Sequence, residues 1–198
     1  MNPNDYPWPD QHLRTPGVLR WDRAGYGVQP GGADVRGRTP VAAVGSNAAP
    51  AVLARKLAAL GSGWVSMEPR ALQGVQVGHS AHVSVQGYVP ASPYVGEGAA
   101  QAVVGWFDDE QLALLDATEP NYVRLRLDAD VDVYASRWGV VAIDGVPVPL
   151  TGQAELLRLL RPPALAGGSL ADPAVAARVS DWLHETHAMD AGWPGVGR

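Results

Sequence analysis

The segment that most constrains this chain is an apolar run that ends in small polar residues and is followed at once by a helix. Residues 41–44 read Val-Ala-Ala-Val, and residues 45–47 read Gly-Ser-Asn. Pro50 fits the first position of a helix, where its missing N–H costs nothing. We therefore predict a strand, a loop and a helix over 50–60, with amino-terminal N–H groups that suit a carboxylate, a phosphate or an oxyanion. An ordinary strand-turn-helix connection is the alternative.

A second informative block is a buried apolar run that leads into a short helix. Residues 102–107 are continuously apolar, apart from one glycine, and predict a strand. Asp108 caps the helix that follows, and Gln111 three residues later completes a capping box. Pro120 ends that helix and leaves Glu119 in its last turn.

Together the two blocks resemble the gamma-glutamylcyclotransferase-like superfamily, over roughly residues 40–150. In that superfamily a strand ends in an aromatic-Gly-Ser-Asn loop that opens the first helix, and a later Leu-Asp-x-x-Glu segment supplies an acid/base glutamate. The residues of this chain that match the two motifs are Gly45, Ser46, Asn47, Leu115, Asp116 and Glu119, and Val44 takes the aromatic position of the substrate-binding loop. The resemblance implies an α+β fold, a compact mixed β-barrel flanked by helices.

The activity that the resemblance implies is cyclisation of a gamma-glutamyl amine or peptide to 5-oxoproline, with release of the amine and without cofactor or metal. Glu119 is then the catalytic residue, which takes a proton from the attacking α-amine and gives one to the leaving amine, as a partly buried carboxyl group with a raised pKa does. The N–H groups of residues 45–47 hold the substrate carboxylate or the developing oxyanion. Tyr122 and Arg124 share a strand face, where a structural cross-strand pair is expected, with lining of the same pocket as the alternative.

A second hypothesis keeps the same fold as a non-catalytic module for small-molecule binding or interaction. Val44 stands where the superfamily usually has an aromatic residue, and Pro120 stands where a glycine is usual. Both departures indicate a reshaped pocket with a different or lost reaction. Because a fold does not fix a function, both hypotheses stay open at this point.

Composition divides the chain into three segments. Residues 1–40 are rich in Pro, Gly and Asp, so we predict an irregular arm whose aromatic side chains pack on the domain or on a neighbouring subunit of a homodimer. Residues 41–160 are predicted to form the gamma-glutamylcyclotransferase-like domain, with a hairpin that turns at Asp144 and Gly145. Residues 161–198 are predicted to be a linker and a helix that packs on this domain.

Charge and cysteine content exclude several classes of function. A net charge of -5 and a pI near 5.4 provide no basic surface for nucleic acid or an anionic membrane. The chain has no cysteine, which excludes disulfides and thiolate metal sites. It lacks a signal-peptide pattern and an apolar run of membrane-spanning length, so we expect a cytoplasmic protein. The resemblance implies that its partner is a small molecule with a gamma-glutamyl-like group.

Two histidine pairs have spacings that resemble metal-binding motifs. His79 and His82 are three apart in a predicted extended strand, so they face opposite sides and do not share a metal ion unless the strand bulges. His184 and His187 share a helix face with Asp181 but lack the spacing of a zinc-protease motif. We predict a solvated helix face for this second pair.

A run of alternating aspartates imitates the start of a calcium loop. Val133 occupies the sixth position of that loop, where a glycine is required, and Gly139 occupies the twelfth, where a glutamate is required. We therefore predict that Asp128, Asp130 and Asp132 form the solvent-facing side of a strand.

Overall fold

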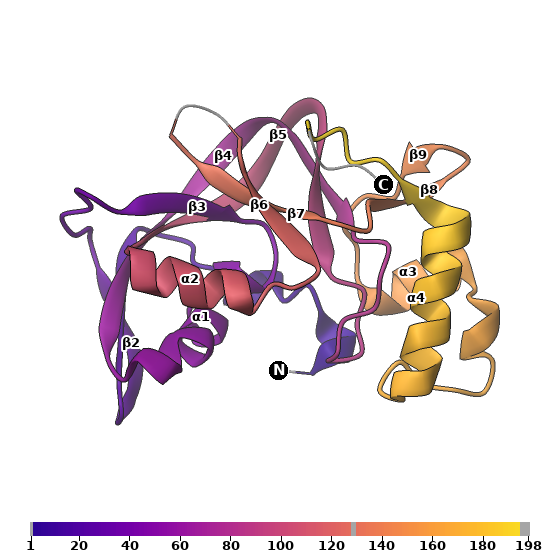
Figure 1. The fold of residues 1–198 in the computed structure, drawn as a ribbon, viewed down its shortest axis with the longest axis horizontal. Helices are drawn as coiled ribbons and strands as arrows, with labels where there is room; N and C mark the ends of the chain where they lie inside the picture. The colour runs from indigo at the N-terminus through magenta and orange to yellow at the C-terminus, as the bar shows by residue number, and fades with distance from the viewer. Residues whose placement is uncertain (1, 128–129, 195–198) are drawn as a thin grey trace. The chain divides into compact units, whose positions relative to one another are not determined.

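The chain has an α+β fold that combines a large, mostly antiparallel sheet with helices (Figure 1). The computed structural model describes residues 2–127 and 130–194. Contacts divide the chain into two compact units that alternate along the sequence. Unit 1 contains Met1–Pro9, Gly74–Gly98 and Ala135–Arg198, and unit 2 contains Asp10–Gln73 and Ala99–Tyr134. The predicted segment boundaries at residues 40 and 160 do not coincide with the ends of these ranges.

Seven strands form the large sheet, in the spatial order β2-β1-β4-β5-β3-β7-β6. Their bounds are Gly17–Asp22 (β1), Gly25–Pro30 (β2), Thr39–Ala43 (β3), Gly63–His79 (β4), Ala91–Phe107 (β5), Tyr122–Arg126 (β6) and Asp132–Ser136 (β7). The pairs β1–β2, β1–β4 and β3–β5 are antiparallel, whereas β3 and β7 run parallel.

The large sheet is open in the part of the chain that the structure describes, with β2 and β6 as its edges. The predicted compact barrel is therefore not found among these residues. Alternation of apolar and polar residues predicts strands, but it does not decide whether the two edges of a sheet pair with each other.

Four α-helices lie within the described residues, and their bounds are Pro50–Leu57 (α1), Asp109–Ala117 (α2), Gln153–Leu160 (α3) and Pro173–His187 (α4). None of them combines the length and the apolar character that crossing a membrane requires. Short 3-10 helices cover Pro3–Asp5 (η1), Pro9–Gln11 (η2), Ser46–Ala48 (η3), Ala58–Leu60 (η4) and Pro163–Leu165 (η5). The capping box predicted for α2 is present, with the Asp108 side chain and Gln111 bonding each other's backbone N–H groups.

A second, three-stranded sheet has the order β10-β8-β9, with bounds Ala188–Met189, Val140–Ile143 and Val146–Pro147. The predicted hairpin is confirmed, because β8 and β9 are joined at Asp144 and Gly145, whose φ angles are 51° and 76°. Positive φ at both central residues is what a tight type I′ hairpin turn requires.

The prediction of an irregular arm over residues 1–40 is wrong for its middle part, where β1 and β2 form a hairpin. The carboxylate of Asp22 accepts hydrogen bonds from the N–H groups of Ala24 and Gly25, at 2.7 and 3.2 Å. This aspartate turn reverses the chain. Leu19 and Trp21 on β1 are buried, whereas all six residues of β2 are exposed. Because only β1 of the two strands is buried, the apolar pattern in the sequence is too short to predict a strand pair.

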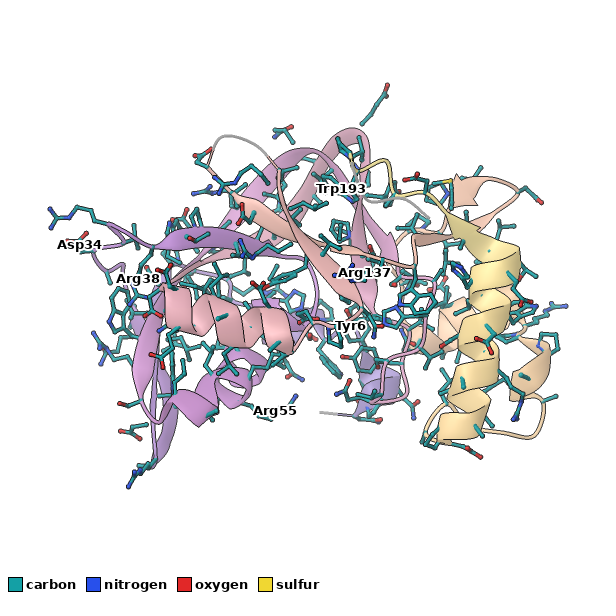
Figure 2. The ribbon with its side chains drawn as sticks, in the orientation of Figure 1. Tyr6, Asp34, Arg38, Arg55, Arg137 and Trp193 are labelled. Atoms are coloured by element: carbon teal, nitrogen blue, oxygen red, sulfur yellow. The ribbon has the colours of Figure 1, made fainter. Side chains whose placement is uncertain are left out.

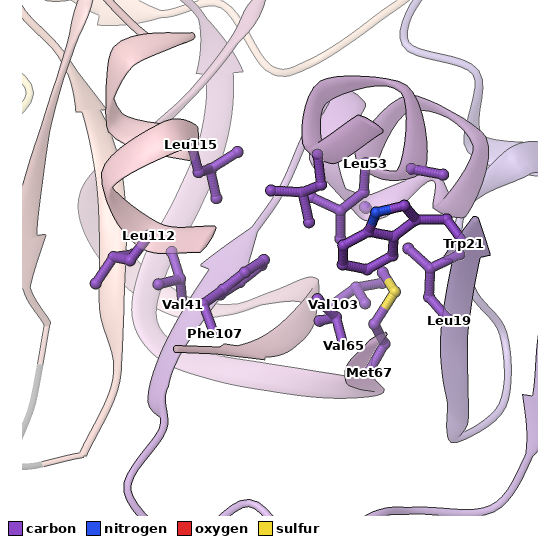
Figure 3. Packing of buried hydrophobic residues seen from close by; sticks show 13 residues of the cluster. Leu19, Trp21, Val41, Leu53, Val65, Met67, Val103, Phe107, Leu112 and Leu115 are labelled. Atoms are coloured by element: carbon purple, nitrogen blue, oxygen red, sulfur yellow. The ribbon is translucent and has the colours of Figure 1, made fainter. Parts of the chain in front are cut away.

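The core of unit 2 forms between the sheet and the helices α1 and α2, which lie side by side (Figures 1 and 3). Leu53 and Leu57 of α1 are completely buried, as the predicted apolar stripe requires, and Leu115 of α2 is 1% exposed. They pack in one cluster with Trp21 of β1 and Phe107 of β5. The helix predicted over 50–60 is divided into α1 and η4.

Unit 1 has its own apolar core, built on α3, α4 and β8. Leu156, Val179 and Leu183 from the two helices are completely buried there. The first residues of the chain belong to this unit, and Figure 2 labels Tyr6 among them. The Tyr6 ring stacks on Tyr88 with ring centres 4.2 Å apart. The docking expected of the arm's aromatic residues is therefore seen at Tyr6, which is 1% exposed.

We expect Tyr6→Ala to lower the free energy of unfolding by about 3 kcal/mol or more, because it removes a buried aromatic ring. Tyr6→Phe should cost about 1–3 kcal/mol, because the Ala91 N–H, which donates to the Tyr6 hydroxyl at 2.7 Å, loses its acceptor. Urea unfolding measures both effects. Tyr26→Ala is the control, since Tyr26 is 55% exposed, and an equal loss in all three variants would contradict the docking of Tyr6.

Candidate functional site

The predicted substrate loop forms a 3-10 turn between β3 and α1. The N–H groups of Ala48 and Ala49 donate to the carbonyl oxygens of Gly45 and Ser46, at 2.9 and 3.1 Å. The N–H groups of Gly45, Ser46 and Asn47 donate no hydrogen bond to any residue that the structure describes. The turn therefore leaves three successive backbone N–H groups without an acceptor among the described residues. That they bind an anion stays a prediction.

Glu119 follows the last turn of α2 and is held by its own backbone. Its N–H donates to the carbonyl of Asp116 at 3.1 Å, and its carbonyl accepts from the N–H of Tyr122 at 3.0 Å. Its side chain is only 14% exposed. The Oε1 atom accepts a hydrogen bond from Asn47 Nδ2 at 2.9 Å and also forms an ion pair with Lys56 Nζ. The two blocks of the sequence resemblance thus meet within unit 2, through Asn47 and Glu119.

Lys56 is the residue of this site that the sequence analysis missed. It lies in the second turn of α1, and its side chain is 17% exposed. It is the only lysine in a chain that otherwise uses arginine for all its basic side chains. That singular choice was the available signal, since lysine and arginine are not interchangeable in an ion pair.

The Asn47 side chain is oriented by the carboxylate. Its Nδ2 faces Glu119, because an amide oxygen in that position would repel the carboxylate oxygen. Its Oδ1 is buried and has no hydrogen-bond partner among the described residues. The amide is therefore positioned through its nitrogen.

A second polar network surrounds Asp116, the aspartate of the Leu-Asp motif. Arg124 bonds both carboxylate oxygens of Asp116, from Nε at 3.0 Å and Nη2 at 3.1 Å, and the Tyr134 hydroxyl donates to Oδ1 at 2.6 Å. Burial alone would raise the pKa of Asp116, but these hydrogen bonds outweigh it and hold the pKa below its usual value. Burial, the contact with Asp116 and the nearby charge of Glu119 raise the pKa of Tyr134.

The solvent-facing strand predicted for the alternating aspartates is wrong at Asp132. This residue is 3% exposed, and its carboxylate bonds Arg124 Nη1 at 2.6 Å and Arg126 Nε at 2.5 Å. Two guanidinium groups compensate the buried charge, and alternation in sequence does not reveal such pairing. Asp130 is exposed, as predicted, and Asp128 lies outside the described residues.

Arg124 accordingly forms the structural cross-strand pair that was the alternative to a pocket role. Tyr122 and Val44 are both half-buried, and Tyr122 contacts Glu119 through its backbone N–H. That Val44, Tyr122 and the loop line a ligand pocket with Glu119 stays a prediction.

The histidine pairs belong to unit 1. β4 ends at His79, whose Nε2 accepts from the N–H of Thr151 at 3.0 Å, while His82 lies beyond the strand with Nδ1 2.6 Å from Ser80 Oγ. His184 is exposed, whereas His187 is half-buried and its Nδ1 lies 2.9 Å from the carbonyl of Ala142. No cluster of three or more His, Asp or Glu side chains that could hold a metal ion occurs in residues 2–127 and 130–194.

We expect the free energy of unfolding to fall as the pH is lowered from about 6.5 to about 4. Burial lowers the pKa of both His79 and His82 from 6.5 to about 4, against a smaller opposing effect of the Val89 backbone on His79. The unfolded chain thus binds protons that the folded chain excludes, and the loss should be about 1–3 kcal/mol for each histidine.

Urea unfolding at several pH values tests this expectation. His82→Asn keeps a polar group near the Nδ1 position and should flatten the pH dependence, whereas His184→Gln on the exposed face of α4 should leave it unchanged. A pH profile that both variants share with the unaltered chain would contradict the assignment.

Comparison with known proteins assigns no family. No protein-family model, curated protein or solved structure matches the chain. The chemistry of the site is therefore argued from the contacts of Asn47, Lys56 and Glu119.

Proposed function

We propose that unit 2 carries a gamma-glutamylcyclotransferase-like site that cyclises a gamma-glutamyl amine or peptide to 5-oxoproline. The observation that carries this proposal is the hydrogen bond between Asn47 Nδ2 and the Glu119 carboxylate. It joins the two sequence blocks that resemble the superfamily, through two residues that are 72 positions apart in the sequence. The finer assignment of the fold to that superfamily is part of the same proposal.

In the proposed reaction Glu119 acts as both general base and general acid. Its carboxylate removes a proton from the α-amine of the substrate as the nitrogen attacks the γ-carbonyl carbon, which closes the five-membered ring. The C–N bond to the leaving amine then breaks, and the leaving nitrogen receives a proton from the same carboxyl group. A half-buried side chain beside backbone donors suits this double role.

The turn at residues 45–47 would stabilise the charge that develops on the γ-carbonyl oxygen. Its three N–H groups are fixed by η3 and have no other acceptor in the described part of the chain. Fixed donors of this kind need no reorganisation during the reaction, and removing one from an oxyanion hole costs about 100-fold or more in rate.

The ion pair between Lys56 and Glu119 favours a second candidate function, a non-catalytic site for an anionic or zwitterionic small molecule. The carboxylate that the reaction needs as a base already holds a cation at Oε1. A ligand with a carboxylate would be attracted by Lys56 and by the free N–H groups of the turn, without any proton transfer.

We expect Glu119→Gln to reduce the rate of 5-oxoproline release from gamma-glutamyl amines and dipeptides by at least about 100-fold, since it preserves the shape but removes the proton-transfer group. Chromatographic detection of 5-oxoproline measures the rate. Glu110→Gln is the matched control, because Glu110 is exposed in the first turn of the same helix, α2.

Equal turnover by the Glu119→Gln variant would exclude Glu119 as the acid and base. If the unaltered protein releases no 5-oxoproline but binds 5-oxoproline or glutamate in calorimetry, and Lys56→Met abolishes that binding, the second candidate replaces the first. Neither turnover nor binding would contradict both.

A further inference from the structure

Three side chains of different chemistry meet at one oxygen atom of unit 2. Lys56 supplies an amine, Asn47 a primary amide, and Glu119 the carboxylate whose Oε1 contacts both nitrogens. An ion pair alone would need only the first and the third. The amide is the additional element, and it is a group that an amine can attack.

We propose that this triad forms a covalent cross-link, a side-chain amide between Lys56 Nζ and Asn47 Cγ, with Glu119 as the proton carrier. The cross-link would be an intramolecular modification of the chain. It goes beyond the proposed function and does not depend on it, because it requires no ligand.

The atoms and charges balance without an oxidant or a co-reactant. The ammonium group of Lys56 first gives a proton to the Glu119 carboxylate, and the neutral amine adds to Asn47 Cγ. The bond from Cγ to Nδ2 then breaks, and Glu119 returns its proton to the departing nitrogen. The remaining proton of the former ammonium leaves with it, so the products are the amide, an ammonium ion and the Glu119 carboxylate.

Direct contact serves the first of these steps. The side chains of Lys56 and Glu119 are 17% and 14% exposed, and Lys56 Nζ contacts Glu119 Oε1. The proton therefore passes from the amine to the carboxylate without an intervening water, and the amine that remains is a nucleophile.

Proximity favours the second step. Lys56 Nζ and Asn47 Nδ2 contact the same oxygen atom, Glu119 Oε1, and Asn47 Cγ is bonded to Nδ2. The amine and the amide therefore react as parts of one molecule, and such placement raises their effective concentration. Asn47 is held through Nδ2, the atom that must receive a proton before it leaves.

Lys56 is the only lysine, so the chain offers one possible cross-link of this kind. The link would tie η3 to α1 and remove the charge of Lys56. It would leave the N–H groups of residues 45–47 unchanged and would replace the ion pair at Glu119 Oε1 by the N–H of a neutral amide.

Intact mass spectrometry of the purified full chain tests the proposal against a variant of identical composition. The double variant Arg55→Lys, Lys56→Arg moves the lysine to a neighbouring position that is exposed on α1 (Figure 2). We expect the unaltered chain to be lighter than this variant by the mass of one ammonia molecule. Equal masses after prolonged incubation would overturn the proposal.

Tryptic digestion locates the link. In the cross-linked chain the peptides 39–55 and 56–70 remain joined, because the modified Lys56 is not cleaved, whereas the unlinked chain gives 39–55 and 57–70 separately. Glu119→Gln should abolish the joined species while circular dichroism shows an unchanged fold, and a full yield of joined peptides from Glu119→Gln would contradict the role of Glu119. The readout uses no substrate, so failure of the cross-link and failure of the cyclotransferase activity are distinguishable.

Discussion

Burial of the facing apolar sides of α1 and α2 is the interaction on which the rest of unit 2 depends. Leu53 and Leu57 contribute from α1, and Leu115 from α2, to a single core cluster against the sheet. Removing a leucine side chain from such a core costs about 2–5 kcal/mol. This packing holds α2 beside α1, and so it brings Glu119, after the end of α2, to Lys56 in the last turn of α1 and to Asn47 before that helix. The polar contacts at Glu119 Oε1 therefore depend on the apolar packing of the two helices.

Different basic residues compensate the carboxylates beside this core. Arg124 links Asp116 to Asp132, and Arg126 completes the compensation of Asp132. This network joins α2 to β6 and β7. Glu119, only three residues after Asp116, is compensated by Lys56 from α1 instead. Asp116 and Asp132 therefore keep their arginine partners when the protonation or the bonding of Glu119 changes.

Local chemical signals made part of this fold predictable from the sequence. Pro50 marks the start of α1, Asp108 with Gln111 caps α2, and Asp144 with Gly145 forms the turn between β8 and β9. Each signal acts within a few residues, where one backbone conformation satisfies the local hydrogen bonds. The aspartate turn at Asp22 belongs to the same class and could have been found, because its side chain caps the turn in the same way.

What escaped prediction depends on tertiary contacts that no short motif reveals. Lys56 contacts Glu119, which lies 63 residues away in the sequence, and the burial of Asp132 depends on two arginines of the strand β6. The open edges of the large sheet are likewise set by strand pairing and not by a local pattern. The placement of Glu119 beside Asn47 was expected only because a resemblance supplied the long-range information. Whether the Glu119 side chain is solvated or buried likewise depends on α1, which lies far from Glu119 in the sequence.

The two proposals place different demands on the two oxygen atoms of Glu119. Oε1 already accepts from Asn47 and contacts Lys56, so a substrate amine must approach Oε2 or displace the lysine. While Lys56 remains charged, it competes with the substrate amine for the Glu119 carboxylate, whose negative charge is needed to accept the substrate proton. If Lys56 is joined to Asn47 as an amide, that competition ends and a hydrogen bond from a neutral N–H takes its place. The cross-link would then free the charge of the carboxylate for a ligand, and the ion pair that now favours simple binding would be a precursor state of the site.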